Sequence, residues 1–256
     1  MTPIPPAFST DDAKNAGVKE VIGEFSTSLT ADRVRTGNLT LGAKKLTGLV
    51  FKPGEVFSLE KSLGPVTAEN GWGYAGVVEN GIHTTGLGGG LSQLCVTTLN
   101  AAWFAGMDLI EFHPHSEWYT RYPMGRECTL WTGSLDLKWK NPNPNAVVLQ
   151  GWTGGGKLHI RLWGTKYYTV ESQQSGKSGV VAPRTVVNNS PKCESSGAGQ
   201  PGFTVTNTRT RYLNGKQVDS KSYTHTYVPQ NNVVCAKDLA AQQASEEATP
   251  PPSTDD

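Results

Sequence analysis

The sequence predicts an α+β fold, in which a mainly antiparallel sheet packs on a buried central helix and is followed by a small all-β hairpin module. Three observations support this prediction. Residues 86–106 carry no charged side chain and follow a helical pattern that is apolar or small on every side, which is typical of a core helix. Apolar and polar residues alternate in segments after this helix, as in half-buried strands. The 29 glycines and 16 prolines indicate many turns.

The first third of the chain is predicted to supply one helix and several strands. Residues 1–18 are rich in proline and polar side chains, so we expect a flexible N-terminal segment. Thr30-Ala-Asp32 has the pattern of a helix cap, and Pro53-Gly54 breaks the helix that follows. Asn80-Gly81 separates two β-like runs. The expected elements are strand Val21–Phe25, a helix near Arg33–Leu49, and strands Tyr74–Val78 and Ile82–Thr85, while Val56–Leu59 leads into turns.

The central helix follows a glycine run. Gly88-Gly89-Gly90 allows the backbone to approach another chain segment or a ligand closely. Ser92 is placed to cap the helix, which is expected to continue to about Ala105. At about 14 residues this helix is too short to span a bilayer. Ser92 and Gln93 at its positive end would suit a nucleophile, an anion or a polar ligand.

The segment after the central helix is predicted to form strands. Leu135–Lys140 separates apolar and charged positions onto two faces, which places Asp136 on the solvated face. Val147–Trp152 and Lys157–Trp163 flank three glycines, as in a hairpin. Residues 171–192 are interpreted as a linker or an extended connecting strand.

A second hairpin is predicted near the C-terminus. Asn214-Gly215 lies between Phe203–Tyr212 and Lys216–Val228, and this dipeptide favours a type I′ turn. Cys193 and Cys235 lie almost equally far from that turn, so the hairpin brings them opposite each other and a disulfide is expected. The many Thr residues indicate a thin sheet with modest burial, and residues 240–256 are expected to be disordered.

Composition limits the classes of partner. The net charge of +1 indicates neither nucleic acid nor an acidic membrane surface as a partner. The sequence contains no motif that predicts a metal or an organic cofactor, so none is expected. No apolar run is long enough for a membrane helix. Met1–Pro6 lacks the basic start and apolar core of a signal peptide, so we expect an export signal or membrane anchor upstream of this start.

Three blocks in the middle of the chain resemble the VanW family of bacterial cell-envelope proteins. They read GGGLSQLCVTTLNAAWFAG, EFHPHSEWYTRYPMGRE and LDLKWKN, and Asn38, Pro53–Ser58 and Gly64 also fit the family's opening segment. The resemblance covers roughly residues 20–170 and implies a VanW-like domain over residues 19–170. The family is named for its place in a glycopeptide-resistance gene cluster, and no biochemical activity is established for it.

This chain departs from the family pattern at four positions, one of which is Glu127 in place of the family's usual Asp. Ser92 stands where many members have Cys, while Cys95 and Cys128 replace small residues. Two such replacements are explained most simply by a second disulfide, although two buried free thiols are the alternative. Disulfides favour an extracytoplasmic location, secreted or anchored to the membrane. The resemblance adds that the protein is associated with the envelope of a Gram-positive bacterium.

The family resemblance also suggests peptidoglycan or an envelope glycan as the partner. Residues 193–239 resemble the small G5-type β modules of cell-wall proteins, which implies a spacer or adhesive module after the first domain. The first domain would then carry the ligand cleft. A role in glycopeptide resistance is what the family's name implies.

One hypothesis for the chemistry is nucleophilic catalysis by a hydrolase or transferase acting on cell-wall peptide or glycan. Ser92 would attack, His115 would act as the base, and Glu111 or Asp136 would orient the imidazole. Gln93 and backbone N–H groups near Gly90 would stabilise an oxyanion. The alternative is that Ser92 only caps the helix.

A second hypothesis is metal binding. Glu111, His113 and His115 alternate, so on a strand their side chains would share one face, as in a zinc site. The alternative is that His115 satisfies buried backbone groups while His113 faces solvent.

The third hypothesis is a non-catalytic binding module. Aromatic side chains beside polar donors suit sugars or peptide stems, and Arg121 and Arg126 could pair with a carboxylate. Alternatively, Arg126 would fix loops by donating to carbonyls, and the aromatic residues would be core. We expect Ser92 and His115 beside one concave pocket. The residues predicted to bind ligand are Gly88, Gly89, Gly90, Gln93, His113, Ser116, Trp118, Tyr122 and Arg126.

Overall fold

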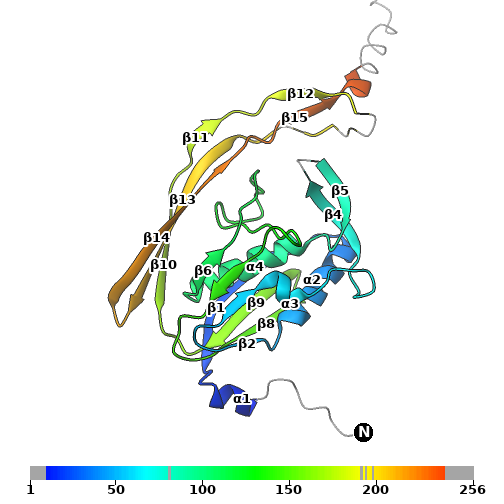
Figure 1. Ribbon diagram of the computed structural model, residues 1–256. Coiled ribbons are helices and arrows are strands. Elements are labelled where there is room, and N and C mark those ends of the chain that lie inside the picture. Colours follow the sequence, from blue (N-terminus) through cyan, green and yellow to red (C-terminus); the bar gives the residue numbers. More distant parts are fainter. Residues whose placement is uncertain (1–9, 80–81, 191–192, 194, 198, 240–256) are drawn as a thin grey trace, which may run out of the picture. The chain divides into compact units, whose positions relative to one another are not determined.

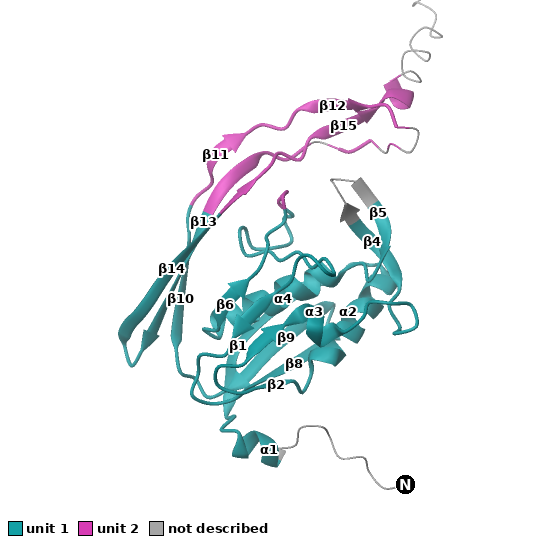
Figure 2. Ribbon diagram, viewed as in Figure 1, with its two compact units in different colours: residues 1–115, 119–175, 206–224 teal, residues 116–118, 176–205, 225–256 magenta. Residues whose placement is uncertain are grey.

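The computed structural model describes residues 10–79, 82–190, 193, 195–197 and 199–239, which form two compact units (Figure 2). The first unit contains residues 1–115, 119–175 and 206–224, and the second contains residues 116–118, 176–205 and 225–256. Within the predicted flexible segment 1–18, helix α1 spans Thr10–Asn15, and residues 1–9 lie outside the described part. The predicted disordered tail, residues 240–256, also lies outside it.

The first unit is built on a four-stranded sheet with the order β1-β9-β8-β2 (Figure 1). All three pairings are antiparallel. Apolar residues on one face of β9 are fully buried, namely Leu158, Ile160 and Leu162. These mixed elements agree with the predicted α+β class. The strands are β1 (Glu20–Ser28), β2 (Val50–Phe51), β8 (Val147–Gly154) and β9 (Lys157–Gly164).

Helices α2 (Arg33–Leu46) and α4 (Leu91–Phe104) pack on this apolar face of the sheet. A methyl group on Gly23 would lie 2.4 Å from the Ala101 carbonyl oxygen of α4, and one on Gly151 would lie 2.9 Å from the Ala43 oxygen of α2. Glycine at these two strand positions therefore lets both helices approach the sheet closely. Every residue of the central helix from Leu91 to Trp103 except Ser92 is buried, as predicted for a core helix.

Smaller elements surround this core. A three-stranded sheet has the order β3-β7-β6, and β4 pairs with β5 in a separate hairpin. Helix α2 ends three residues before the predicted Leu49, because Thr47 leaves the helical conformation and Gly48 adopts a φ of +85°. The bounds are β3 (Val56–Ser58), α3 (Leu59–Leu63), β4 (Tyr74–Glu79), β5 (Ile82–Leu87), β6 (Asp108–Glu111) and β7 (Lys138–Lys140).

A long hairpin follows the core, formed by β13 (Gly202–Leu213) and β14 (Lys216–Tyr227), with β10 (Thr169–Gln174) paired to β13. Asn214 and Gly215 have φ values of 50° and 76°. Positive φ at both central residues is the signature of a type I′ turn, so this prediction is confirmed.

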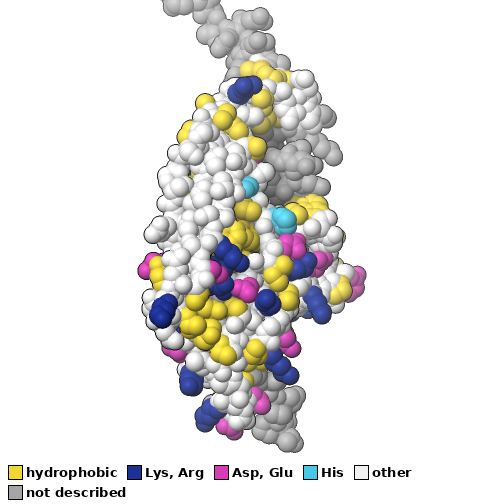
Figure 3. Space-filling model, turned by 60° about the vertical axis from the view of Figure 1, so that its left-hand side comes forward, with side chains coloured by type: hydrophobic (Ala, Val, Ile, Leu, Met, Phe, Trp, Pro, Cys, Tyr) yellow, Lys and Arg dark blue, Asp and Glu magenta, His cyan; other side chains and the backbone are white. Residues whose placement is uncertain are grey.

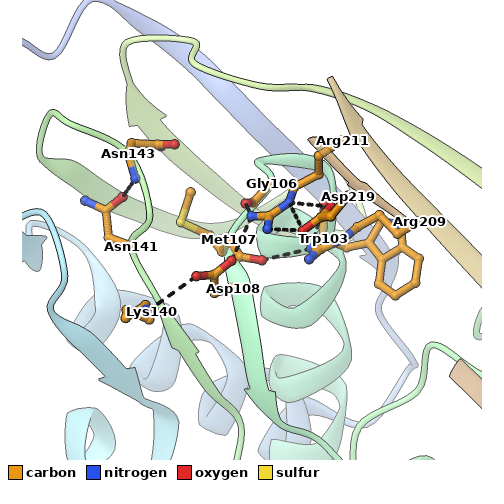
Figure 4. A network of polar contacts seen from close by, with 10 residues as sticks. All are labelled: Trp103, Gly106, Met107, Asp108, Lys140, Asn141, Asn143, Arg209, Arg211 and Asp219. Atoms are coloured by element: carbon orange, nitrogen blue, oxygen red, sulfur yellow. Dashed lines mark hydrogen bonds and ion pairs between the residues drawn. The ribbon is translucent and has the colours of Figure 1, made fainter. Parts of the chain in front are cut away.

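Two arginines of β13 cover the C-terminal end of α4 (Figure 4). Arg209 Nη1 donates to the Met107 carbonyl at 2.9 Å, and Arg211 Nη1 donates to the Gly106 carbonyl at 2.7 Å. Arg211 also pairs with Asp108 at 2.8 Å and with Asp219. Arg209 is 1% exposed and Arg211 is 6% exposed. This part of the hairpin is therefore more deeply buried than the thin sheet that the sequence predicted. Cations suit the negative end of a helix.

The boundaries of the two compact units therefore differ from those of the predicted linker, residues 171–192, and of the predicted module, residues 193–239. Residues 206–224 of the hairpin belong to the first unit. The predicted linker contains β10 and two short strands, β11 (Ser178–Val181) and β12 (Thr185–Asn188). That residues 19–170 and residues 193–239 fold independently stays a prediction.

The second unit contains β11, β12, β15 (Asn232–Cys235) and the adjoining ends of β13 and β14. Strands β12 and β15 pair in parallel. Cys193 and Cys235 form a disulfide with Cα atoms 5.7 Å apart, as the hairpin symmetry predicts. The second predicted disulfide, Cys95–Cys128, lies in the first unit and ties α4 to the segment after β6. Both of its cysteines are fully buried.

On the face drawn in Figure 3, basic and acidic side chains are interspersed without a broad area of one sign. This distribution agrees with the net charge of +1. Among the residues that the structure describes, no helix is long and apolar enough to cross a membrane.

Candidate functional site

The glycine turn before α4 is closely packed on all sides. Gly88 and Gly90 have φ values of +72° and +106°, and a methyl group on Gly89 would lie 2.4 Å from the Ala75 carbonyl oxygen. The helix therefore begins at Leu91 with Gly90 as its N-cap, and this cap makes no side-chain hydrogen bond. The prediction that Ser92 caps the helix is wrong, because Ser92 already lies within the first turn.

Asn38 of α2 holds the glycine turn in place. Its Nδ2 donates to the carbonyl oxygens of Gly73 and Gly89, each at 3.0 Å, and its Oδ1 accepts from Gly73 N at 2.8 Å. Asn38 is 2% exposed. Because both ends of this buried amide are used, the turn is fixed relative to α2.

Gln93 is fully buried in the first turn of α4. Its Nε2 donates to Thr27 Oγ1 at 3.0 Å and to the Ser28 carbonyl at 2.9 Å. These two acceptors orient the amide, so that Oε1 points at Arg35 and accepts from its Nε and Nη2 at 3.3 and 3.2 Å. Gln93 therefore orients the Arg35 guanidinium. The sequence had instead suggested that Gln93 donates a hydrogen bond to an oxyanion.

Arg35 is the residue that the sequence reasoning missed. It lies three residues before Asn38 on α2, so both side chains point to the same helix face, and this spacing was the available signal. A methyl group on Gly90 would lie 2.7 Å from Arg35 Cγ, so the arginine stem packs on the glycine. Among the ion pairs of the described residues, none includes Arg35.

Tyr122 and His115 continue the site from the segment after β6. Tyr122 is 7% exposed, and burial raises the pKa of its hydroxyl, while the positive charges of Arg35 and Arg121 and a hydrogen bond with Arg35 oppose that rise. The His115 ring lies 5.9 Å from the Tyr122 ring and 5.3 Å from the Tyr119 ring. Tyr122 therefore lies beside the Arg35 guanidinium, and the His115 and Tyr119 rings extend from it in turn.

Ser92 and His115 contact neighbouring residues of one segment. His115 Nδ1 lies 2.8 Å from Thr129 Oγ1, and Ser92 Oγ accepts from Leu130 N at 3.3 Å. The structure thus places both predicted catalytic residues at the same stretch of chain. The contacts form a closed ring, which we call the α4 ring; its members are Arg35, Gln93, Ser92, Leu130, Thr129, His115 and Tyr122.

The hydrogen-bond partners of Glu111 are residues other than His115. It ends β6 and accepts from Lys138 Nζ at 2.7 Å, from Asp136 N at 3.1 Å and from His113 Nε2 at 3.3 Å. The hydrogen bond from Lys138 is the main cause of a lowered Glu111 pKa. The prediction that Glu111 orients the His115 imidazole is therefore wrong.

The predicted metal set is likewise not assembled. Strand β6 ends at Glu111, so His113 and His115 follow in a non-strand segment and lose the alternation that would place them on one face. In the part of the chain that the structure describes, no three His, Cys, Asp or Glu residues are grouped to hold a metal ion. Pro114 between the histidines disfavours continued strand pairing.

Asp136 is also placed differently from its predicted solvated position. It is 4% exposed and accepts from Ser58 Oγ at 2.6 Å, Glu60 N at 2.9 Å and Leu137 N at 2.7 Å. This carboxylate satisfies backbone N–H groups at the start of α3 and its own turn, so it has a structural role.

Arg126 packs beside α4 rather than at the wall of the site. Its guanidinium lies 5.5 Å from the Trp103 ring and 5.2 Å from the Phe104 ring, and burial lowers its pKa. Its carbonyl accepts from Asn100 Nδ2 at 2.9 Å. The structure connects none of these groups with the α4 ring.

Ser116 and Trp118 belong to the second compact unit. The Ser116 carbonyl accepts from Val228 N at 2.9 Å, and the Trp118 ring lies 5.5 Å from Phe203 and 4.2 Å from Lys177 Nζ. The ligand-binding set predicted from the sequence is therefore divided between the two units. The structure joins Gln93, Tyr122 and the Gly88–Gly90 turn, while His113 lies with Glu111.

Comparison with known proteins supplies the family. The VanW family, described as "VanW like protein", matches residues 34–163, which is half of the chain. The chain belongs to the VanW family. The match includes α2 from Val34 onward, the whole of α4 and every member of the α4 ring.

A curated relative has 27% identity to this VanW protein over 143 residues. It is the uncharacterized protein YoaR of Bacillus subtilis (strain 168), and the alignment covers 56% of this chain and 47% of the relative. This chain thus spans about half the length of that relative. No solved structure matches at a significant level.

Proposed function

We propose that this VanW protein is an extracytoplasmic cell-envelope protein that binds peptidoglycan or an envelope glycan. The observation that carries the proposal is the α4 ring. It combines aromatic rings with polar donors and a guanidinium that forms no ion pair with any residue the structure describes, and such combinations suit sugars and peptide stems. The two disulfides suit an oxidising compartment.

The C-terminal strands complete the proposal as a spacer or adhesive module of the G5 type. Their type I′ hairpin and exposed Thr and Ser side chains fit a β module that faces an aqueous wall matrix. This role would be secondary to ligand binding at the α4 ring.

Binding to purified cell-wall sacculi tests the proposal. We expect the wild-type protein to sediment with sacculi, and the variants His115→Ala and Tyr119→Ala to sediment less, because each removes a ring from the site. Tyr212→Ala is the matched control, since this tyrosine lies at the turn end of β13 and binds Glu171. Equal retention of all four proteins, or no retention of the wild type, would contradict the proposal.

A second candidate is a hydrolase or transferase that uses Ser92 and His115. The observation in its favour is that both side chains contact the adjacent residues Leu130 and Thr129. An enzyme requires His115 to accept the Ser92 proton in the substrate complex. Turnover of peptidoglycan fragments that is lost in both Ser92→Ala and His115→Ala would support this activity, and unchanged turnover in either variant would exclude that residue from catalysis.

A further inference from the structure

Arg35 has an unusual electrostatic environment for a partly buried arginine. Its Nε and Nη2 both donate to the neutral amide oxygen of Gln93, at 3.3 and 3.2 Å, and it shares a hydrogen bond with the Tyr122 hydroxyl. Asp32, three residues earlier, accepts a hydrogen bond from the backbone N of Arg35. No ion pair within the described residues includes the Arg35 guanidinium. Partly buried guanidinium groups usually have an anionic partner.

Two of the three charges that act on the Tyr122 hydroxyl, those of Arg35 and Arg121, are positive. The positive charge of Arg121, like that of Arg35, lowers the pKa of the Tyr122 hydroxyl. The Arg121 guanidinium lies 5.9 Å from the Tyr122 ring. The first turn of α4, which carries Gln93, is the positive end of that helix, and its Gly90 cap supplies no side-chain acceptor. Glu127 opposes these charges from a fully buried position. An anion at Arg35 would therefore be favoured.

The guanidinium is also held in advance of binding. Gln93 is fixed by Thr27 and Ser28, and the Arg35 stem packs on Gly90. A pre-oriented fork loses little conformational entropy when it pairs with a planar anion. The Gln93 acceptor is neutral and lies 3.2–3.3 Å from the Arg35 donors, whereas a carboxylate would form shorter, charge-assisted hydrogen bonds.

We propose that Arg35, oriented by Gln93 and Tyr122, binds a carboxylate of the envelope ligand. This inference rests on the proposed function and names the chemical group that the site recognises. The carboxylate comes either from the C-terminus of a peptide stem or from an acidic sugar. The aromatic rings of Tyr122 and His115 pack against the remainder of that ligand.

Titration with defined probes tests the inference. The probes are an acetylated alanine dipeptide with a free C-terminal carboxylate, the same dipeptide as its amide, and glucuronic acid as an acidic sugar; binding is followed by amide chemical shifts. We expect the wild type to bind at least one carboxylate probe and to bind the amide at least about 10-fold more weakly. Arg35→Gln should weaken carboxylate binding about 10- to 100-fold.

Matched variants separate binding from folding. Arg33→Gln removes an exposed arginine two residues earlier on α2 and should leave binding unchanged. Arg35→Lys keeps the charge but loses the planar fork, so it should bind with intermediate affinity. Unfolding midpoints of all variants are measured, and a loss of binding counts only in a variant that remains folded.

Each outcome has a defined meaning. Carboxylate binding that is equal in the wild type and Arg35→Gln, amide binding as strong as acid binding, or no binding of either carboxylate overturns the inference. Binding of the sugar alone, lost in Arg35→Gln, supports it and assigns the carboxylate to the glycan. If sacculi retain both the wild type and Arg35→Gln, the proposed function stands and the inference fails. If sacculi retain neither protein while carboxylate probes bind through Arg35, the inference stands and the proposed function fails.

Discussion

At the scale of single residues, the candidate site depends on positions where no other side chain fits. Gly90 combines a φ of +106° with contact to the Arg35 stem, and Gly89 touches the Ala75 backbone. Gln93 uses both ends of its amide, so neither a shorter nor a charged residue would make the same contacts. These residues fix the position of Arg35 before any ligand arrives.

The substitution Gly90→Ala is therefore expected to affect both stability and the site. A residue with a Cβ at this φ costs about 1–2 kcal/mol, and the methyl group would lie 2.7 Å from Arg35 Cγ. Urea unfolding should show a decrease in the free energy of unfolding of at least about 1 kcal/mol. Gly54→Ala is the control, because Gly54 has a φ of +80° with no neighbour within 4 Å of the new methyl group. An equal decrease in both variants would mean that contact with Arg35 contributes nothing.

At the scale of elements, arginines from other segments hold both ends of α4. Arg35 of α2 lies beside its first turn, whereas Arg209 and Arg211 of β13 donate to the Trp103 carbonyl in its last turn and to the Gly106 and Met107 carbonyls just after it. Cations at the last turn are stabilising, and a cation at the first turn is not. The C-terminal arginines therefore have a structural role, while the N-terminal one needs an anion to be fully stabilised.

Removal of the Asp219 charge tests the C-terminal network. The hydrogen bond from Arg211 lowers the pKa of Asp219 below its ordinary 3.8. Because the folded pKa is below the unfolded one, Asp219 stabilises the fold above about pH 4, and this contribution is lost as the pH falls through the folded value. Asp219→Asn should lower the free energy of unfolding by about 1.5–3 kcal/mol at pH 7, and the difference from wild type should shrink below pH 4.

An exposed ion pair provides the comparison for this variant. Glu24 binds Arg161 at 2.7 Å and is 59% exposed, so Glu24→Gln should change the free energy of unfolding by about 0–1 kcal/mol. Urea titrations at pH 7 and pH 3 measure both variants. A difference between Asp219→Asn and wild type that is the same at both pH values would contradict the assigned role.

At the scale of the whole molecule, each compact unit contains one disulfide. Cys95–Cys128 lies in the core of the first unit, and Cys193–Cys235 lies in the second, where few large apolar side chains are buried. A unit with a small core depends more strongly on a covalent constraint.

Loss of the Cys193–Cys235 disulfide should loosen the second unit. The bridge spans 42 residues, and closing such a loop contributes about 4 kcal/mol in the chain-entropy model. In Cys193→Ala/Cys235→Ala, protease should cleave within residues 176–205 at a concentration that leaves the wild type intact. Mass spectrometry of the unreduced, exported wild type should find no alkylatable thiol. Four free thiols there would remove both disulfide assignments, and unchanged cleavage in the variant would show that the bridge does not stabilise this unit.

Local patterns were sufficient for several features of this protein. Asn214-Gly215 determined its turn because few residues accept positive φ, and the uncharged run after Gly90 determined a core helix. The hairpin symmetry also paired Cys193 with Cys235. In each case the information lies within a short segment or in distances counted along one hairpin.

Tertiary structure alone decided the candidate site. Arg35 and Gln93 are 58 residues apart, and Arg209 and Met107 are 102 apart, so neither pairing follows from a local pattern. Asp136 is buried and accepts a hydrogen bond from Ser58, which is 78 residues away, although its own segment alternates like a solvated strand. The sequence by itself determined the central helix and the hairpins, because these depend on backbone preference and local periodicity, and its motifs carried the resemblance to the VanW family. Which polar groups meet around α4 depended on long-range packing, since only the folded chain fixes the burial and partners of each charge.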